Sequence, residues 1–152
     1  MFGLVAVVTA ACSFTDDGAG PAVPSPSGKA AEACRVLHAA LPKHVGGQRR
    51  GTTEPESKYT AAWGDPAVEL RCGVPRPKQL TPGSAAYNPT SDAVEVNGVS
   101  WLLDKREGGY RFITTDRRAY VELTVPDAYA PEVNALPDLA TAVRQSVPKR
   151  SG

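Results

Sequence analysis

Alternating apolar and polar residues in the middle of the chain predict strands with one buried face. Val68, Leu70 and Cys72 are separated by single charged residues, which matches the two-residue period of a strand. The same alternation occurs over residues 59–63 and 119–125. We therefore expect these segments to direct their apolar side chains toward a core.

Turn signals divide the strand-forming region into hairpins. Asn97 and Gly98 lie between two apolar runs, which is a strong hairpin pattern. Residues 107–109 mark a second hairpin, which leads into a strand at 110–114. Residues 64–66 form a turn between two strands, and residues 78–92 are expected to be a loop. Most strand pairs should therefore be antiparallel.

Helical patterns precede and follow the strands. Residues 30–41 are expected to form a helix that ends before Pro42, because a residue before proline is disfavoured in the helical conformation. Residues 132–147 carry a second apolar stripe, which Pro137 either interrupts or restarts as the first residue of another helix. The order predicts an α+β fold, with a mainly antiparallel sheet and both helices packed on one of its faces. The stripe of the first helix consists of Cys34, Leu37, His38 and Leu41.

The first residues of the chain resemble an export signal. An apolar run over residues 4–11 ends in two alanines and is followed by Cys12. This run is too short to cross a bilayer, which requires about 20 apolar residues, but it matches a signal-peptide core and cleavage site. Cys12 resembles the lipidated cysteine of bacterial lipoproteins, whose acyl chains (palmitate among them) hold the protein in the membrane. Secretion without a lipid and an N-terminal strand of a cytosolic protein are the alternatives.

Composition divides the rest of the chain into a linker and one domain. Residues 1–11 are expected to be a signal peptide that is truncated at its N-terminus, because no basic residue precedes the apolar run. Residues 12–29 are rich in Pro, Gly and Ser and predict a disordered linker behind the lipidated cysteine. A single globular domain is expected over residues 30–148, followed by a tail at 149–152. The predicted location is extracytoplasmic, on the outer face of the cell membrane.

Charge and motifs exclude several classes of function. The chain has 17 basic and 16 acidic residues, and its basic residues are scattered, so no nucleic-acid partner is expected. It carries no nucleotide-binding loop, no dinucleotide fingerprint, no serine-nucleophile elbow and no zinc-protease motif. No cofactor, metal or catalytic residue is therefore predicted.

Two further cysteines fall on surfaces that face the core. Cys34 lies on the apolar stripe of the first helix, and Cys72 lies on the apolar side of its strand. In an exported protein this arrangement predicts a disulfide. The alternatives are a metal site, with His38 and His44 as further ligands, and two unpaired buried thiols.

A candidate recognition surface surrounds the turn at residues 64–66. Trp63, Asp65, Arg71 and Trp101 are its predicted members, with Arg71 on the solvent side of its strand. The competing interpretation places both tryptophans in the core and makes Asp65 a turn former. These residues favour a non-catalytic binding or accessory module with an envelope protein or a wall component as partner. The alternative is a small hydrolase or transferase acting on wall or lipid precursors.

The chain also resembles a known family. The segment at 61–77 carries the most specific part, Trp-Gly-Asp-Pro followed by Arg-Cys-Gly-Val-Pro, and the segments at 96–102 and 118–122 agree with it. Over residues 32–147 the chain is similar to small actinobacterial envelope lipoproteins that are catalogued only as a domain of unknown function. The resemblance implies a lipid anchor and pairing of Cys34 with Cys72. It implies no reaction and no ligand.

Overall fold

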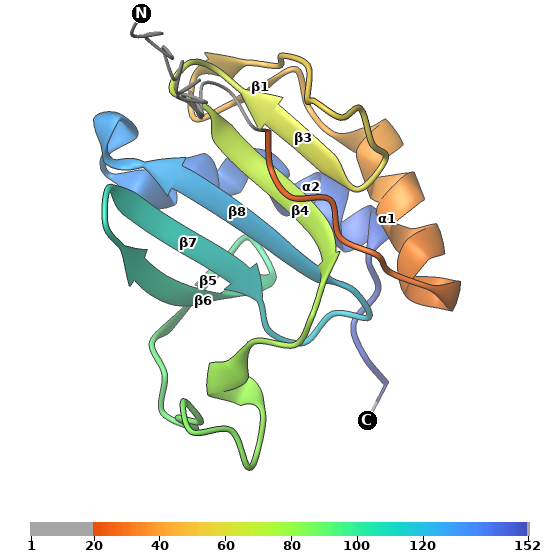
Figure 1. Ribbon diagram of the computed structural model, residues 1–152, viewed down its shortest axis with the longest axis vertical. Coiled ribbons are helices and arrows are strands. Elements are labelled where there is room, and N and C mark those ends of the chain that lie inside the picture. The colour runs from red at the N-terminus through yellow and green to blue at the C-terminus, as the bar shows by residue number, and fades with distance from the viewer. Residues whose placement is uncertain (1–19, 152) are drawn as a thin grey trace, which may run out of the picture.

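The structure is a computed structural model that describes residues 20–151, and it contains two α-helices and two antiparallel sheets (Figure 1). The predicted α+β class is confirmed. No helix of the described part is long and apolar enough to cross a membrane. In chain order the elements are α1 (Gly28–Ala40), β1 (His44–Val45), β2 (Gln48–Arg49), β3 (Thr60–Trp63), β4 (Val68–Val74), η1 (Lys78–Leu80), β5 (Ala93–Val96), β6 (Val99–Arg106), β7 (Gly109–Thr114), β8 (Tyr120–Pro126), η2 (Asp127–Tyr129), η3 (Glu132–Ala135) and α2 (Pro137–Ser146).

The main sheet has six antiparallel strands in the order β3-β4-β8-β7-β6-β5. The last strand in sequence, β8, therefore lies between β4 and β7 and joins the two halves of the sheet. Both helices pack behind this sheet in Figure 1, so one face is covered as predicted. The opposite face remains available for a site.

Local sequence accounts for the hairpins. Asn97 and Gly98 both have positive φ, 50° and 84°, which is the backbone that a two-residue hairpin turn requires. They connect β5 to β6, and the turn between Arg106 and Gly109 connects β6 to β7. Both hairpins were predicted. The short β1–β2 hairpin was not, because its strands are too short to show alternation.

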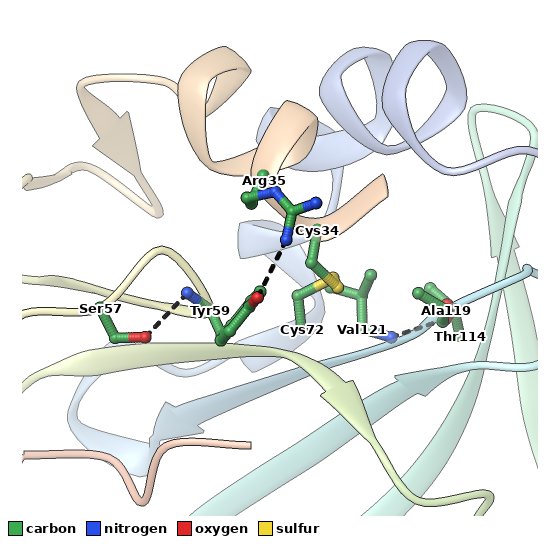
Figure 2. The surroundings of a disulfide bond; sticks show 8 residues. All are labelled: Cys34, Arg35, Ser57, Tyr59, Cys72, Thr114, Ala119 and Val121. Atoms are coloured by element: carbon green, nitrogen blue, oxygen red, sulfur yellow. Dashed lines mark hydrogen bonds between the residues drawn. A yellow bond between two sulfur atoms is a disulfide. The ribbon is translucent and has the colours of Figure 1, made fainter. Parts of the chain in front are cut away.

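A disulfide fastens α1 to the sheet. Cys34 and Cys72 are joined with their Cα atoms 5.5 Å apart, and both residues are almost fully buried. Figure 2 shows the bridge between α1 and β4. The predicted pairing is present, and it contradicts the metal-site alternative because neither cysteine has a free thiol to ligate a metal. The bridge closes a loop over a sequence separation of 38 residues.

The boundaries of the domain differ from those expected. Helix α1 begins at Gly28 rather than residue 30, and residues 20–27 run along the sheet face that the helices leave open (Figure 1). Pro26 packs so closely on Gly73 that a Cβ at Gly73 would lie 2.5 Å from its ring. The predicted linker over residues 12–29 therefore extends too far toward the C-terminus. Its last residues belong to the domain, because the ring of Pro26 and the backbone of Ala22 contact β4.

The two predictions at the C-terminus have different outcomes. Pro137 opens α2 at its first turn, after the separate η3, so the second of the two interpretations of residues 132–147 is confirmed. The expected tail at 149–152 is partly docked. Lys149 forms a β-bridge with Arg117, and the Arg150 N–H donates to the Asp116 carbonyl at 2.8 Å. These backbone groups find partners on the loop before β8, which sequence alone does not place nearby.

Candidate functional site

Charged side chains form a row across the open face of the sheet. Strand alternation directs Cys72 toward the helices, so its neighbour Arg71 points to the other face. Arg71 is registered opposite Glu122 of β8, and Asp104 of β6 is registered opposite Arg111 of β7. Because neighbouring strands lie about 4.8 Å apart, side chains at these positions can touch across the sheet.

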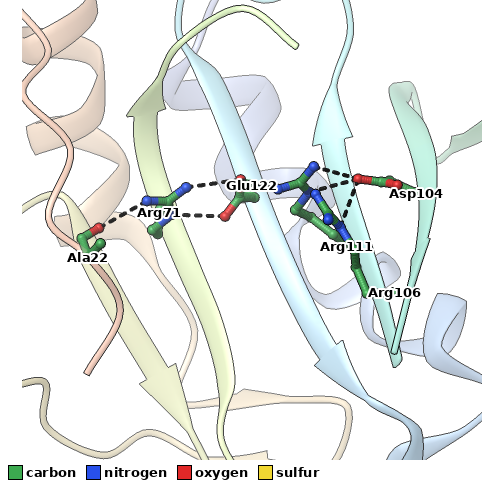
Figure 3. A network of polar contacts seen from close by, with 6 residues as sticks. All are labelled: Ala22, Arg71, Asp104, Arg106, Arg111 and Glu122. Atoms are coloured by element: carbon green, nitrogen blue, oxygen red, sulfur yellow. Dashed lines mark hydrogen bonds and ion pairs between the residues drawn. The ribbon is translucent and has the colours of Figure 1, made fainter. Parts of the chain in front are cut away.

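The row is a continuous network of ion pairs. Arg71 holds Glu122 with two hydrogen bonds, from Nε to Oε1 at 2.8 Å and from Nη2 to Oε2 at 3.2 Å. Arg111 lies 3.9 Å from the same carboxylate and donates from Nε to Asp104 at 3.0 Å. Arg106 forms an ion pair with the same Asp104 oxygen through its own Nε at 3.1 Å. Figure 3 shows the order Arg71, Glu122, Arg111, Asp104 and Arg106, which we call the arginine row.

Burial gives the arginine row its rigidity. Glu122 is only 7% exposed, and both of its oxygens accept from Arg71. Arg71 also donates from Nη1 to the carbonyl of Ala22 at 3.3 Å, so the segment before α1 helps to hold it. A carboxylate this far from water needs its partners, because a buried charge without one is strongly unfavourable. Arg71 thus lies on the outward side of its strand, as predicted, but it is held there by hydrogen bonds to Glu122 and Ala22.

Glu69 lies on the same face of β4, two residues before Arg71 of the arginine row. Burial raises the pKa of the Glu69 carboxyl above its ordinary value, and the nearby Arg71 opposes this shift. Its side chain lines a small separate cleft with Gly20 and Thr53. It does not line the larger hollow described next.

A hollow of about 410 Å³ lies over the arginine row and is closed on one side by the segment that follows β4. The hollow is within the range of small-ligand pockets. Five of its lining residues are basic and one is acidic: Arg71, Arg76, Lys78, Arg106 and Arg111 against Glu122. Val74, Pro75, Pro77, Ala86 and Ile113 give it an apolar wall.

The basic residues around the hollow are not all neutralised. Arg71 and Arg111 are held by the carboxylates of Glu122 and Asp104. Within residues 20–151, Arg76 and Lys78 make no ion pair, and both are exposed. Arg106 forms its ion pair with Asp104 through Nε, and half of the Arg106 side chain is exposed. The hollow therefore has a fixed charged floor and several cations that remain available to a ligand.

The structure disperses the recognition surface expected from the sequence. Trp63 and Trp101 are fully buried in the core, where the Trp63 indole N–H donates to the Pro42 carbonyl at 3.0 Å. Asp65 is exposed at the turn between β3 and β4. Arg71 alone among the four lines the hollow. The two tryptophans pack beneath the helices, as in the competing interpretation.

Sequence reasoning missed the other members of the arginine row. Glu122 occupies an outward position of the alternating segment at 119–125, so its direction could be predicted. Asp104, Arg106 and Arg111 lie in segments that do not alternate, so only the structure shows which face they occupy. The proximity of these residues to Arg71 could not be predicted either, because β8 inserts between β4 and β7. No local pattern in the chain indicates that Glu122 should stand between Arg71 and Arg111.

A second cleft, of about 230 Å³, contains His38 together with Arg50, Glu56 and Ser57. The ring Nε2 of His38 lies 3.2 Å from Arg50 Nη2, so the neutral ring accepts this hydrogen bond. Burial lowers the pKa of His38, and the positive charge of Arg50 lowers it further. The Arg50 guanidinium also lies 5.6 Å from the centre of the Trp63 ring.

This second cleft does not have the geometry of a nucleophile and its base. The Ser57 hydroxyl accepts from the Tyr59 backbone N–H, and no hydrogen bond within the described residues joins it to His38. His44 is exposed on β1 and does not line this cleft. No group of three His, Cys, Asp or Glu residues in the described part is arranged to hold a metal.

Comparison with protein families gives a match over residues 1–152 to DUF3515, described as a protein of unknown function. The chain belongs to the DUF3515 family. This confirms the predicted membership in a family of unknown function, while the envelope-lipoprotein character of such proteins stays a prediction. No curated protein and no solved structure matches the chain.

Proposed function

We propose that this DUF3515 protein is an exported domain, held at the outer face of the cell membrane by a lipid on Cys12, that binds an anionic ligand without converting it. The observation that carries the proposal is the hollow over the arginine row, which has five basic residues and one carboxylate in its lining. A concave surface with an excess of one charge concentrates ligands of the opposite charge. The chain as a whole is nearly neutral, so this excess is local.

Binding is favoured over catalysis by the state of the polar groups in the hollow. The Glu122 carboxylate is occupied on both oxygens by Arg71, and one oxygen of Asp104 accepts a hydrogen bond from Arg111 and forms an ion pair with Arg106. A general base needs an accessible lone pair near its substrate. Arginine itself remains protonated and cannot serve in that role. The arrangement is therefore suited to holding a charge in place.

Export is supported by the buried disulfide. Bonds of this kind persist in oxidising compartments and are rare in the cytosol. The tether would be short, because the eight residue steps from Cys12 to Gly20 can span at most roughly 28 Å. The domain would then stay within reach of the membrane surface.

The hydrolase or transferase interpretation has one observation in its favour, namely the cleft that His38 shares with Glu56 and Ser57. Arg50 opposes it, because its hydrogen bond occupies the ring nitrogen that a base would use. Loss of turnover of a wall or lipid precursor in a His38→Gln variant would establish this function in place of simple binding.

The anion-binding proposal is tested by calorimetric titration of the full chain with citrate, sulfate and inorganic phosphate. We expect at least one of these anions to bind and its affinity to fall as salt is raised. Arg106→Glu should abolish that binding, since it places a negative charge at the rim of the hollow. Arg49→Glu makes the same change of charge on exposed β2 and should leave binding intact. Binding that survives Arg106→Glu would contradict the proposal.

The tether is tested separately by fractionating cells that produce the Cys12→Ala variant. A diacylglyceryl group supplies two acyl chains, which suffice for stable anchoring at about 0.8 kcal/mol per buried methylene. We expect the variant to move from the membrane to the medium. An unchanged membrane fraction would refute lipidation at Cys12.

A further inference from the structure

We infer that the ligand of the hollow is a diphosphate ester, with the floor of the arginine row setting its position and Arg76, Lys78 and Arg106 binding its phosphoryl oxygens. This inference rests on the proposed anion-binding function and names the class of ligand. Four features of the hollow lead to it: its excess of charge, the separation of the cations that make up this excess, the pre-organisation of its floor and its apolar wall.

The first feature is the number of charges left unbalanced. Arg71 and Arg111 are offset by Glu122 and Asp104, which they contact directly. Arg76, Lys78 and Arg106 then remain, so three positive charges are in excess around one hollow. A single carboxylate would neutralise only one of them. A diphosphate ester carries two to three negative charges and would neutralise most of the excess.

The second feature is the placement of those three cations. Arg76 and Lys78 follow the end of β4, whereas Arg106 ends β6. The strand order places β6 three positions from β4, which corresponds to roughly 14 Å across the sheet. A lone phosphate presents its oxygens to both sides from a single centre. Two linked phosphoryl groups form an elongated anion that long side chains can grip from opposite ends.

The third feature is the pre-organisation of the floor. Arg71 is held by Glu122 and by the Ala22 carbonyl, and Arg111 is held by Asp104 (Figure 3). These arginines lose little conformational freedom when a ligand arrives, which favours binding. Arginine is also suited to phosphate because its planar donors match pairs of phosphoryl oxygens.

The apolar wall explains why the ligand is an ester. Val74 and Ile113 belong to a small apolar cluster on the open face, with Leu80 packed against it. Val74 and Ile113, together with Pro75 and Pro77, form an apolar side of the hollow. An anion would make no favourable polar contact with this side. The organic group attached to the diphosphate would lie along this wall. That group belongs either to a lipid or to a soluble molecule such as a nucleotide, and both present the same phosphoryl chemistry.

The test compares inorganic diphosphate with orthophosphate and citrate at equal ionic strength, by calorimetry on the full chain. We expect diphosphate to bind at least roughly tenfold more tightly than either, which is the gain of about one charged hydrogen bond. The Arg76→Gln/Lys78→Gln double variant should lose this advantage. Its control is Lys43→Gln/Arg49→Gln, which removes the same charge from exposed positions outside the hollow.

The outcomes separate this inference from the proposal on which it rests. Citrate that binds as tightly as diphosphate, and is lost with Arg106→Glu, would overturn the diphosphate assignment and leave anion binding intact. If no anion binds to the folded protein, both fail. Diphosphate binding that is unchanged in the Arg76→Gln/Lys78→Gln variant would also overturn the inference. Thermal melting of each variant confirms that the domain remains folded.

A second arm distinguishes the two sources of the diphosphate. The full chain with Cys12→Ala is sedimented with phosphatidylcholine vesicles, with and without a polyprenyl diphosphate, and titrated separately with a nucleoside diphosphate. Retention that requires the diphosphate lipid supports a lipid ligand, and tight binding of the nucleotide supports a soluble one. If neither occurs, the ester part of the inference is overturned.

Discussion

The substitution Arg71→Ala tests whether the arginine row is a buried network rather than a set of surface charges. The sequence predicts almost no effect on stability, because Arg71 alternates with core residues and its loss opens no cavity. The structure predicts a clear loss, because the substitution removes the hydrogen bonds that Arg71 donates to both oxygens of Glu122 while only 7% of the residue is exposed.

The magnitude follows from the environment of the pair. Removing one partner of a fully buried ion pair costs about 3 to 5 kcal/mol. Here the Arg71 side chain is 27% exposed, and Arg111 remains 3.9 Å from Glu122, so water and a second cation compensate in part. We therefore expect the free energy of unfolding to fall by about 2 kcal/mol. For a domain of this size that corresponds to a decrease in Tm of roughly 7 °C.

Urea unfolding of the oxidised protein measures this loss, and a double-mutant cycle locates its cause. The Arg71→Met/Glu122→Leu variant removes both charges, so it should be about as stable as the wild type even though Arg71→Met alone is destabilised. Exposed Arg49→Ala is the control for loss of an arginine and should change stability by less than about 0.5 kcal/mol. An Arg71→Ala variant as stable as this control would refute the reasoning.

The remaining predictions concern the core and the second cleft. Reduction of the Cys34–Cys72 bridge should lower the free energy of unfolding by about 4 kcal/mol in the chain-entropy model, measured by urea unfolding with and without reductant; two free thiols in the native exported protein would exclude the bridge. Trp63→Ala should cost about 3 to 5 kcal/mol in thermal or urea unfolding, because the side chain is fully buried. Burial lowers the pKa of His38 in the folded protein, so the unfolded chain binds a proton at this residue more readily. The contribution of His38 to stability should therefore be fully present above the ordinary histidine pKa. It should decrease as the pH falls from that value toward the lowered pKa of the folded protein. Unfolding curves at a series of pH values should show this decrease in the wild type and in His44→Gln but not in His38→Gln; a decrease that persists in His38→Gln would assign it to other groups.

The sequence predicted best what depends on neighbours in the chain. Alternation identified the buried side of β4, and the positive-φ turn at Asn97 and Gly98 identified a hairpin. Proline at the first turn of α2 was one of two interpretations of a single residue. In each case the determining interaction lies within a few residues, so the local pattern contains the information.

The recognition surface shows where this reasoning failed. Trp63 and Arg71 are close in sequence and lie on the two ends of one hairpin, yet the first is in the core and the second is on the open face. Strand phase alone would have separated them. Grouping residues by sequence distance placed side chains from opposite faces of one sheet in a single surface.

The sequence by itself determined the α+β class, the hairpins and the inward direction of Cys34 and Cys72. Only the tertiary structure decided the arginine row and the hollow above it, because both depend on β8 pairing with β4 across the intervening residues 75–119. Strand order is fixed by the packing of the whole sheet on α1 and α2, to which every strand contributes. An alternating pattern can show that a charged side chain points away from the core, but its partner on the neighbouring strand is known only once the order of the strands in the sheet is known.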